Sequence, residues 1–349
     1  MRIFNIMLGR GLGGIEQAFV DYSACLARRG HAVVSVTRNG ARILPTVSAL
    51  KIPGHSVASL NCYGGWDIFC ARALRKLLAE EPVDAIIAHG GRAVSMARRA
   101  AKGIAPVVGL AHNYSTRRLI GCDAIFTITQ DLQQVVTSAG QPAERTFHIP
   151  NMVTEIVPTG GLHTVQQNPP VIGAMGRFVA KKGFTDFLEA LKLLHAEGVP
   201  FRAILAGDGE ERQRLKKRTA MLGLENVVEF PGWITDRAAF FRQCDVFCLP
   251  SHHEPFGIVL LEAMAHGVPV VTTDTEGPRE IITPEEQALV VPIRDVHAMA
   301  TALRQLMLDA AIGKKLAQNA LKHVRAHYSP DSVGTLIEAA LLETLKHTA

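Results

Sequence analysis

The residue types best suited to chemistry in this 349-residue chain lie close together near residue 250. Glu254 sits in a polar segment that ends at Gly257, and the apolar run that follows has a helical pattern. Glu262 lies about two helical turns beyond Glu254. A carboxylate in an apolar helix is costly to bury without a partner, and ribose hydroxyls would fit. The free N–H groups at the start of such a helix favour phosphate. The stretch therefore predicts a docking place for phosphate and hydroxyl groups.

A second candidate is the segment GRFVAKKG, residues 176–183, which follows a short apolar run. Arg177 carries a planar guanidinium and Lys182 a compact ammonium. If the segment joins a strand to a helix, both cations can converge on a diphosphate. An ordinary solvated loop is the alternative, because Arg and Lys are mostly exposed.

A third candidate is the glycine-rich segment GRGLGGIE, residues 9–16, which also follows an apolar run. Its glycines satisfy the GxGxxG pattern of dinucleotide sites. The next apolar run, however, ends at Arg38, where an NAD site has an acidic residue for the ribose. Arg38 suits a 2′-phosphate, so an NADP-binding oxidoreductase stays open. The other interpretations are a loop that lets the backbone approach a phosphate or sugar, and a turn without a ligand.

These motifs must be positioned by strands and helices, and short β-rich runs alternate with helical patterns along the whole chain. The runs are continuously apolar, which is typical of parallel strands covered by helices on both faces. Turn and linker residues interrupt the alternation at residues 151–170. We predict an α/β fold of two doubly wound Rossmann-like domains that face a cleft, residues 1–160 and 161–349, with a C-terminal helix that crosses back to the first domain. Such sheets bind ligands at the carboxyl ends of their strands.

Composition excludes several classes of protein. With 48% hydrophobic and 20% charged residues the chain is globular, and no apolar run is long enough to span a membrane. The six cysteines contain no CxxC pair, which predicts reduced thiols in a cytoplasm. There is no Asp-x-Asp pair, and the adjacent His252 and His253 would point in different directions, so we expect no metal site. The net charge of +5 is unevenly divided: the first half is basic and the second half slightly acidic, and the basic half suits an anionic substrate or membrane surface as well as a solvated face.

Several short motifs in register carry a specific resemblance. GGIE, GRFVAKKG, AGDGE and the EPFGIVLLE segment that begins at Glu254 occur in this order over nearly the whole chain. Together they resemble the retaining nucleotide-sugar glycosyltransferases of family 4, which have the GT-B fold. The resemblance implies metal-independent, retaining transfer of a hexosyl group from a nucleoside-diphosphate sugar, UDP favoured, to a hydroxyl of a cell-envelope glycan or glycolipid. It implies no cofactor.

The resemblance also implies roles for individual residues. Arg177 and Lys182 would hold the diphosphate, Glu262 the nucleotide ribose and Glu254 the transferred sugar. His112, after the apolar run 106–110, matches a histidine near that sugar, so that the catalytic set is His112, Arg177, Lys182 and Glu254. Further donor contacts are implied for Gly14, Gly207, Trp233, Phe256, Gly257, Ile258 and Val259. No residue is identified as a catalytic base.

Two segments depart from the family pattern, and some questions stay open. Glu276 and Gly277 stand where a Gly-Gly pair is usual, and Asn151 and Met152 stand where Asn-Gly is usual. A GT-B epimerase or phosphorylase acting on nucleotide or phosphorylated sugars is the main alternative. Because the family carries its acceptor site in the first half, the basic charge there predicts an anionic or lipid-linked glycan, such as a lipopolysaccharide core. We expect a cytoplasmic protein with peripheral contact to the inner face of the membrane, and no nucleic-acid partner.

Overall fold

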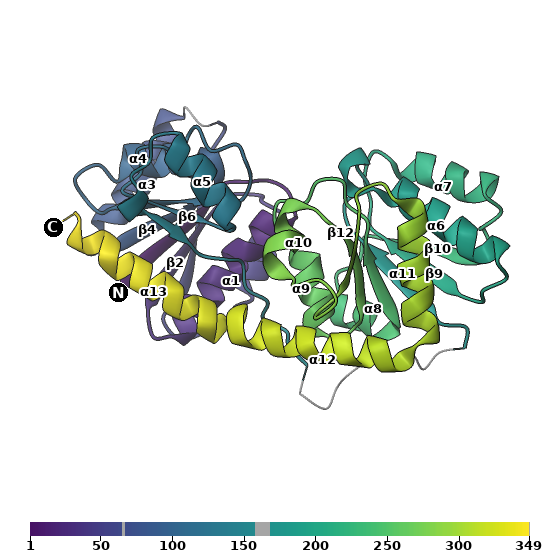
Figure 1. The fold of residues 1–349 in the computed structure, drawn as a ribbon. Coiled ribbons are helices and arrows are strands. Elements are labelled where there is room, and N and C mark those ends of the chain that lie inside the picture. Colours follow the sequence, from purple (N-terminus) through teal and green to yellow (C-terminus); the bar gives the residue numbers. More distant parts are fainter. Residues whose placement is uncertain (65–66, 158–167, 349) are drawn as a thin grey trace. The chain divides into compact units, whose positions relative to one another are not determined.

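The computed structural model describes residues 1–64, 67–157 and 168–348, and its contacts divide the chain into two compact units. Unit 1 comprises Met1–Thr154 and Pro330–Ala349, and unit 2 comprises Glu155–Ser329. The predicted boundary between residues 160 and 161 lies outside the described residues. The return of the last helix to the first unit agrees with the prediction (Figure 1).

Unit 1 is built on a seven-stranded parallel sheet with the order β3-β2-β1-β4-β5-β6-β7. Its strands are β1 (Arg2–Met7), β2 (Ala32–Arg38), β3 (His55–Leu60), β4 (Ala85–His89), β5 (Val107–Ala111), β6 (Ala124–Thr127) and β7 (Thr146–His148). Its helices are α1 (Gly14–Arg28), α2 (Leu44–Ser48), α3 (Ile68–Ala79), α4 (Gly90–Ala100), α5 (Gln130–Ser138), the short η1 (Ala143–Arg145) and α13 (Pro330–Lys346). The continuous apolar runs are the central strands, because both faces of each are buried beneath helices.

Helix α13 is held on α1 by both polar and close-packed contacts. Glu338 accepts a hydrogen bond from Arg29 at 2.6 Å and lies 2.8 Å from Nε2 of His31. Gly334 fits tightly, because a Cβ there would lie 2.8 Å from the sulfur of Cys25 and 2.7 Å from a side-chain carbon of Arg29. The last helix is therefore an integral part of unit 1.

Unit 2 repeats the architecture with a six-stranded parallel sheet of order β10-β9-β8-β11-β12-β13. Its strands are β8 (Val171–Met175), β9 (Arg202–Ala206), β10 (Val228–Gly232), β11 (Val246–Leu249), β12 (Val270–Thr273) and β13 (Leu289–Val291). Its helices are η2 (Ala180–Lys182), α6 (Phe184–Ala196), α7 (Arg212–Met221), α8 (Arg237–Gln243), α9 (Ile258–Ala265), α10 (Glu276–Ile281), α11 (Val296–Leu308) and α12 (Ala310–His327). The core between sheet and helices includes fully buried Phe178 and Phe187. Two Rossmann-like units confirm the predicted fold class.

The cysteines differ from the prediction at one place. Cys62 and Cys70 form a disulfide, with the Cα atoms 5.2 Å apart, so the expectation of reduced thiols is wrong for this pair. The spacing of eight residues matches no motif, and the pair forms between Cys62, just after β3, and Cys70, in the first turn of α3. The remaining cysteines are free and buried. Burial raises the pKa of the Cys25 thiol to about 11 and that of Cys122 to about 12, so both stay protonated at neutral pH. No helix among the described residues is long and apolar enough to cross a membrane.

Candidate active site

Two of the predicted loops of unit 2 lie against each other at the carboxyl ends of paired strands β8 and β11. The backbone N–H of His252 donates to the carbonyl oxygen of Lys181 at 2.8 Å, and its ring Nε2 lies 2.7 Å from Asp186. Gly183 has a left-handed φ of 66°, and a Cβ there would lie 1.9 Å from the carbonyl oxygen of Pro250. The contact between the loops therefore requires glycine at position 183.

This contact gives a stability prediction with a matched control. Gly183→Ala is expected to lower the free energy of unfolding by more than the roughly 1–2 kcal/mol that left-handed backbone alone costs a non-glycine residue. Gly198 also has a positive φ, of 74°, but nothing lies within 4 Å of its Cβ position, so Gly198→Ala should cost only the backbone term. Urea unfolding of both variants checks this. Equal destabilisation by the two substitutions would show that the close approach to Pro250 has no energetic weight.

The charged centre of these loops is an ion pair between Lys182 and Glu254. The Lys182 ammonium contacts Oε2 of Glu254, and the hydroxyl of Ser251 donates to the same oxygen at 3.3 Å. The side chains are only 18% and 9% exposed, so the carboxylate would be costly to bury without the lysine. An anionic ligand that drew the ammonium toward itself would free Glu254 to accept hydrogen bonds from hydroxyl groups.

Glu276 and Gly277, which depart from the family pattern, contact the loop that carries Glu254. Glu276 accepts from the backbone N–H of Glu254 at 3.3 Å and lies 2.8 Å from Nδ1 of His253. Burial alone would raise the pKa of Glu276, but backbone N–H groups and His253 lower it overall. Gly277 donates to the carbonyl oxygen of Glu254 at 2.8 Å, and a Cβ on Gly277 would lie 2.1 Å from the carbonyl oxygen of Phe256. The glycine is needed at position 277, and the acidic residue before it orients the loop.

Glu262 has the charged partner that its burial requires, and only one of its two carboxylate oxygens takes part in that pair. It lies in α9 and is 8% exposed. Oε1 pairs with Arg237, the first residue of α8, whereas Oε2 is buried with no hydrogen-bond partner among the described residues. Burial raises the pKa of Glu262, with Arg237 opposing and Glu155 adding to the rise. The unpaired oxygen leaves room for a hydroxyl donor. Arg237 was missed by sequence reasoning, because nothing in its local pattern distinguishes it from other arginines.

The remaining candidates of unit 2 lie at the carboxyl edge of the same sheet as Glu254 and Glu262. Arg177 is exposed, and Trp233 is 43% exposed just after β10. Gly207 closes the β9 end tightly, since a Cβ there would lie 1.9 Å from the carbonyl oxygen of Gly176. Phe256 is buried and Gly257 caps α9 with a φ of 98°, which places Ile258 and Val259 in the first turn. Free backbone N–H groups and cationic side chains thus share this edge, as an anion requires.

The structure places His112 and Gly14 in unit 1. Gly14 begins α1 after the β1 loop, and His112 follows β5, so both lie at the carboxyl edge of the first sheet. His112 is buried beside His89, with Nε2 of His112 3.1 Å from Nδ1 of His89. Nε2 of His89 lies 2.8 Å from the Oδ1 of Asn5, whose amide nitrogen donates to the carbonyl oxygen of Phe19.

This chain of hydrogen bonds fixes the protonation of His112. The amide oxygen of Asn5 can only accept, so His89 carries its proton on Nε2. Nδ1 of His89 then accepts, and His112 is the donor through Nε2. Burial lowers the pKa of His112 to about 3, and burial together with the charge of His112 lowers the pKa of His89 well below its usual value. His112 is therefore neutral, with Nδ1 as a hydrogen-bond acceptor.

The neutral histidine pair gives a pH prediction. The unfolded chain binds protons on these rings below about pH 6.5, whereas the folded chain leaves His112 neutral down to about pH 3. Stability is thus expected to fall as the pH drops from 6.5 toward 3, by up to about 1.4 kcal/mol per pH unit for each histidine. Urea midpoints measured from pH 7.5 to 5 check this. His112→Gln should flatten the profile and His297→Gln, an exposed control, should not; equal slopes for all three proteins would contradict it.

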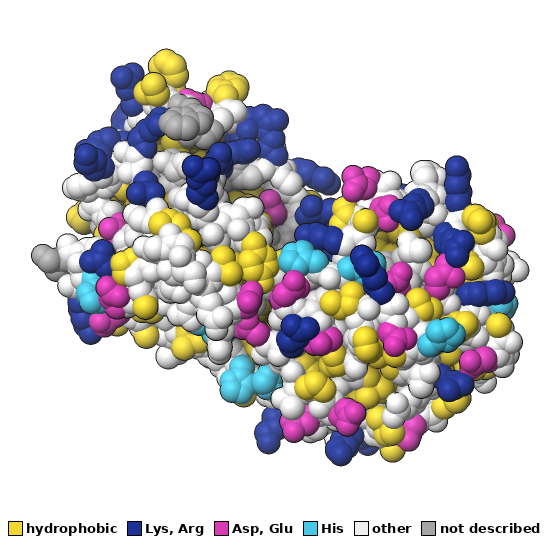
Figure 2. Space-filling view, turned by 45° about the horizontal axis from the view of Figure 1, so that its top comes forward, with side chains coloured by type: hydrophobic (Ala, Val, Ile, Leu, Met, Phe, Trp, Pro, Cys, Tyr) yellow, Lys and Arg dark blue, Asp and Glu magenta, His cyan; other side chains and the backbone are white. Residues whose placement is uncertain are grey.

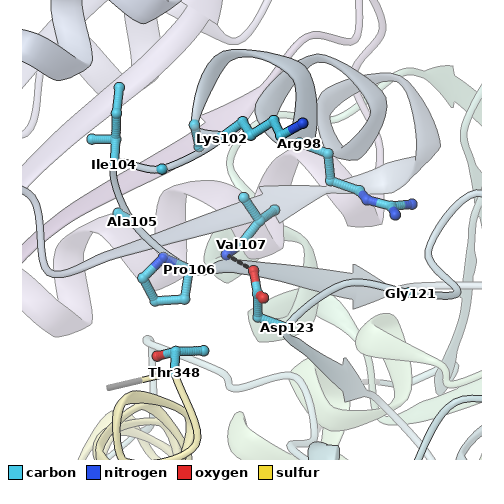
Figure 3. Close-up of a pocket in the computed structure, with 11 residues that line it drawn as sticks. Arg98, Lys102, Ile104, Ala105, Pro106, Val107, Gly121, Asp123 and Thr348 are labelled. Carbon is cyan, nitrogen blue, oxygen red and sulfur yellow. Dashed lines mark hydrogen bonds between the residues drawn. The ribbon is translucent and has the colours of Figure 1, made fainter.

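The basic residues of unit 1 occupy two different edges of its sheet. Figure 2 shows Lys and Arg side chains gathered around the upper part of this unit. Arg98 and Lys102 line a cavity of about 450 Å³ at the amino-terminal ends of β5 and β6, where Asp123 accepts from the backbone N–H of Val107 at 2.7 Å (Figure 3). This edge is opposite the one that carries His112. Over the described part of the chain, no group of His, Cys, Asp and Glu could hold a metal ion.

Two Rossmann-like units, each with a parallel sheet and with candidate residues that follow its strands, define a protein of the GT-B class. Comparison with known proteins supports this. The family model described as "Glycosyl transferases group 1" matches residues 163–323, and "Glycosyltransferase Family 4" matches residues 12–155. The lipopolysaccharide core biosynthesis glycosyltransferase LpsE of Rhizobium meliloti is 30% identical over 343 residues, 95% of this chain and 96% of LpsE. The chain belongs to the family 4 glycosyltransferases, as the motifs predicted.

Other relatives and solved structures agree. LpsD of Rhizobium meliloti, also named as a lipopolysaccharide core biosynthesis glycosyltransferase, is 35% identical over 47% of this chain and 46% of its own length. HepE of Anabaena, solved with UDP and glucose, superimposes with a TM-score of 0.81 at 21% identity, covering 98% of this chain and 99% of HepE. A glycosyltransferase of Rickettsia africae gives 0.84 at 18% identity, covering 99% and 98%. These likenesses confirm the GT-B fold, and family membership decides against a dinucleotide interpretation of residues 9–16.

Proposed function

We propose that this enzyme transfers a hexosyl group from a nucleoside-diphosphate sugar, UDP favoured, to a hydroxyl of a lipopolysaccharide core or related cell-envelope glycan. The observation that carries the donor half is the buried, unpaired Oε2 of Glu262 beside Arg237. A carboxylate oxygen in that state is suited to accept a hydrogen bond from the ribose hydroxyls of a bound nucleotide. LpsE and LpsD are named for lipopolysaccharide core synthesis, and HepE was solved with UDP and with UDP-glucose, which supports both halves.

The proposed reaction uses the charges of the site. The bond between the anomeric carbon and the β-phosphate oxygen breaks, and negative charge develops on the departing nucleoside diphosphate. Lys182, Arg177 and the N-terminus of α9 stabilise that charge without a metal ion or cofactor. The acceptor oxygen forms its bond on the face that the leaving group vacates, so the anomeric configuration is retained. Its proton passes to the departing phosphate oxygen, and Glu254 orients the sugar by accepting from its hydroxyls.

The acceptor is proposed as an anionic or lipid-linked glycan, and the enzyme as a cytoplasmic protein in peripheral contact with the inner membrane surface. The basic half of the chain supports both assignments, because arginine-rich surfaces attract anionic glycans and anionic lipids alike.

The proposal is tested by ligand binding followed by turnover. UDP, GDP, ADP, CMP, dTDP and NADPH are screened by thermal shift, where a ligand of the native state raises the melting temperature. We expect a nucleoside diphosphate to stabilise the enzyme. With the corresponding nucleotide sugar as donor and an envelope glycan as acceptor, free nucleoside diphosphate should be released in the presence of EDTA. NMR should show that the sugar on the acceptor has the same anomeric configuration as in the donor. Stabilisation by NADPH alone, or turnover that leaves the sugar on the nucleotide, would overturn the proposal.

A further inference from the structure

Three arginines of unit 1 stand at the carboxyl ends of three neighbouring strands. Arg10 follows β1, Arg38 ends β2, and Arg92 lies in the first turn of α4 directly after β4. The strands are adjacent in the order β2-β1-β4, and Met7 of β1 is paired with both Thr37 and His89. The three side chains therefore start from one edge of the sheet.

A hydrogen bond and the charges of the group show that the arginines are close. The guanidinium of Arg92 donates to the carbonyl oxygen of Leu8 at 3.3 Å, which ties α4 to the loop that carries Arg10. Partial desolvation and the charges of Arg10 and Arg92 lower the pKa of Arg38. Like charges are thus held near one another.

This arginine set is not neutralised by the protein's own carboxylates. In residues 1–64, 67–157 and 168–348, none of the three forms an ion pair with an acidic side chain. The carboxylate of Glu16 lies over the glycine loop, with Oε1 2.9 Å from the Cβ position of Gly9, without pairing with them. Repulsion among unpaired cations is relieved when an anion binds between them.

A cavity continues from the arginine set along the same unit. It has a volume of about 980 Å³, and Arg92 lines it together with Tyr114, Ser115, Arg117 and Arg118. Arg118 is packed on the backbone of α4, since a Cβ on Gly91 would lie 3.0 Å from its side chain. The volume is at the upper end of the range of small-ligand sites, which is enough for sugar units next to a charged group.

We propose that the arginine set, Arg10, Arg38 and Arg92, binds a phosphate monoester carried by the acceptor glycan, and that the adjoining cavity holds the sugars next to it. This inference rests on the proposed function and assigns the acceptor's chemistry to named residues. A phosphate monoester fits better than a carboxylate, because it carries about two charges and offers three oxygens to guanidinium forks. The cationic candidates for the donor diphosphate, Arg177 and Lys182, lie in unit 2, and the donor contact implied at Gly14 in unit 1 involves no cationic side chain, so the arginine set stays available for the acceptor.

The test compares two acceptors across matched variants. The acceptors are one purified core oligosaccharide that carries a phosphate monoester and the same oligosaccharide after phosphatase treatment. Arg10→Ser combined with Arg38→Ser removes two charges from the arginine set. Arg98→Ser combined with Lys102→Ser removes two charges from the cavity at the opposite edge of the sheet, and Arg98, like Arg92, donates to a backbone carbonyl. Arg38→Lys keeps the charge but removes the fork.

The arginine-set variant is expected to raise KM for the phosphorylated acceptor by roughly tenfold or more, the range for lost charge-assisted hydrogen bonds. In the arginine-set variant, KM for the donor and KM for the dephosphorylated acceptor should stay near the wild-type values. In the control variant, the KM values for donor and acceptor should stay near the wild-type values as well. Arg38→Lys should give an intermediate KM. Because all the replaced side chains except the half-buried Arg38 are exposed, melting temperatures should stay close to that of the wild type.

Each contrary result overturns the proposal in a distinct way. A rise in donor KM assigns the set to the donor diphosphate, and an equal rise for both acceptors removes the role of phosphate. Loss of binding to phosphatidylglycerol-containing vesicles with unchanged acceptor KM assigns the set to the membrane. If the wild type shows no transfer at all, the proposed function fails on its own. Calorimetric titration with the phosphorylated oligosaccharide, weakened in the arginine-set variant alone, then still decides the binding site.

Discussion

Lys182→Ala is expected to lower kcat by roughly 10²–10³-fold, the range measured when a preorganised group that stabilises developing negative charge is removed. Lys182 is the least exposed of the cations in its loop, and it contacts Glu254 directly. In a site shielded from water its charge acts on the departing diphosphate at full strength. We place the loss in kcat, because the interaction strengthens as the sugar leaves.

The neighbouring Lys181 supplies the control. It is exposed and belongs to the same short helix η2, and its backbone carbonyl accepts from the backbone N–H groups of His252 and His253. Lys181→Ala should therefore leave kcat within about twofold of the wild type, since exposed charges have little effect on a shielded site. Hydrolysis of the donor, which releases its sugar into water, must be measured together with transfer to the acceptor. If the two variants lose activity equally, the charge of the loop as a whole matters and the Lys182 contact has no special role.

Glu262→Gln is expected to raise the donor KM by roughly 10- to 100-fold and to change kcat much less, because hydrogen bonds to a charged acceptor contribute about 1.5–3 kcal/mol. Oε2 of Glu262 is buried and unpaired in the free enzyme, so the ligand gains an acceptor that has no other partner to give up. The thermal shift produced by the nucleoside diphosphate should shrink accordingly. Steady-state kinetics and the melting temperature with and without nucleotide check both effects.

Glu229→Gln is the matched substitution. Glu229 also pairs with an arginine of unit 2, Arg202, at 3.7 Å, but both side chains are more than half exposed. It should leave donor KM unchanged, because exposed ion pairs contribute little. A large fall in kcat for Glu262→Gln with constant donor KM would place Glu262 in the chemical step and contradict the ribose assignment.

Local sequence patterns predicted what depends on local structure. The glycines at 183, 207 and 257 lie where strands turn into helices, and the burial of Glu262 followed from its apolar neighbours. Partners supplied by distant segments could not be predicted. Arg237 reaches Glu262 from another helix, and Glu276 reaches the Glu254 loop from the start of α10. The acidic residue at 276 departs from the family pattern, yet it orients that loop.

The same limit applies to unit 1. Each member of the arginine set is unremarkable in its own segment, and only the strand order β2-β1-β4 brings the three together. The sequence indicated an excess of positive charge in this half but could not distinguish the two edges of the sheet. His89 gave no signal either, because its importance for His112 arises from the pairing of β4 with β5 and from Asn5 on β1.

The return of α13 to unit 1 bears on the order of events during synthesis. Residues 155–329 form unit 2 without interruption, whereas unit 1 needs both the first 154 residues and the segment after 329. Arg29 and His31 reach the ribosome's exit long before their partner Glu338. The surface of α1 that α13 covers in the finished protein, including Cys25, therefore stays exposed while the whole of unit 2 is translated. When residue 329 has left the ribosome, unit 2 is complete in sequence, whereas the first unit still lacks α13 and is open to chaperones.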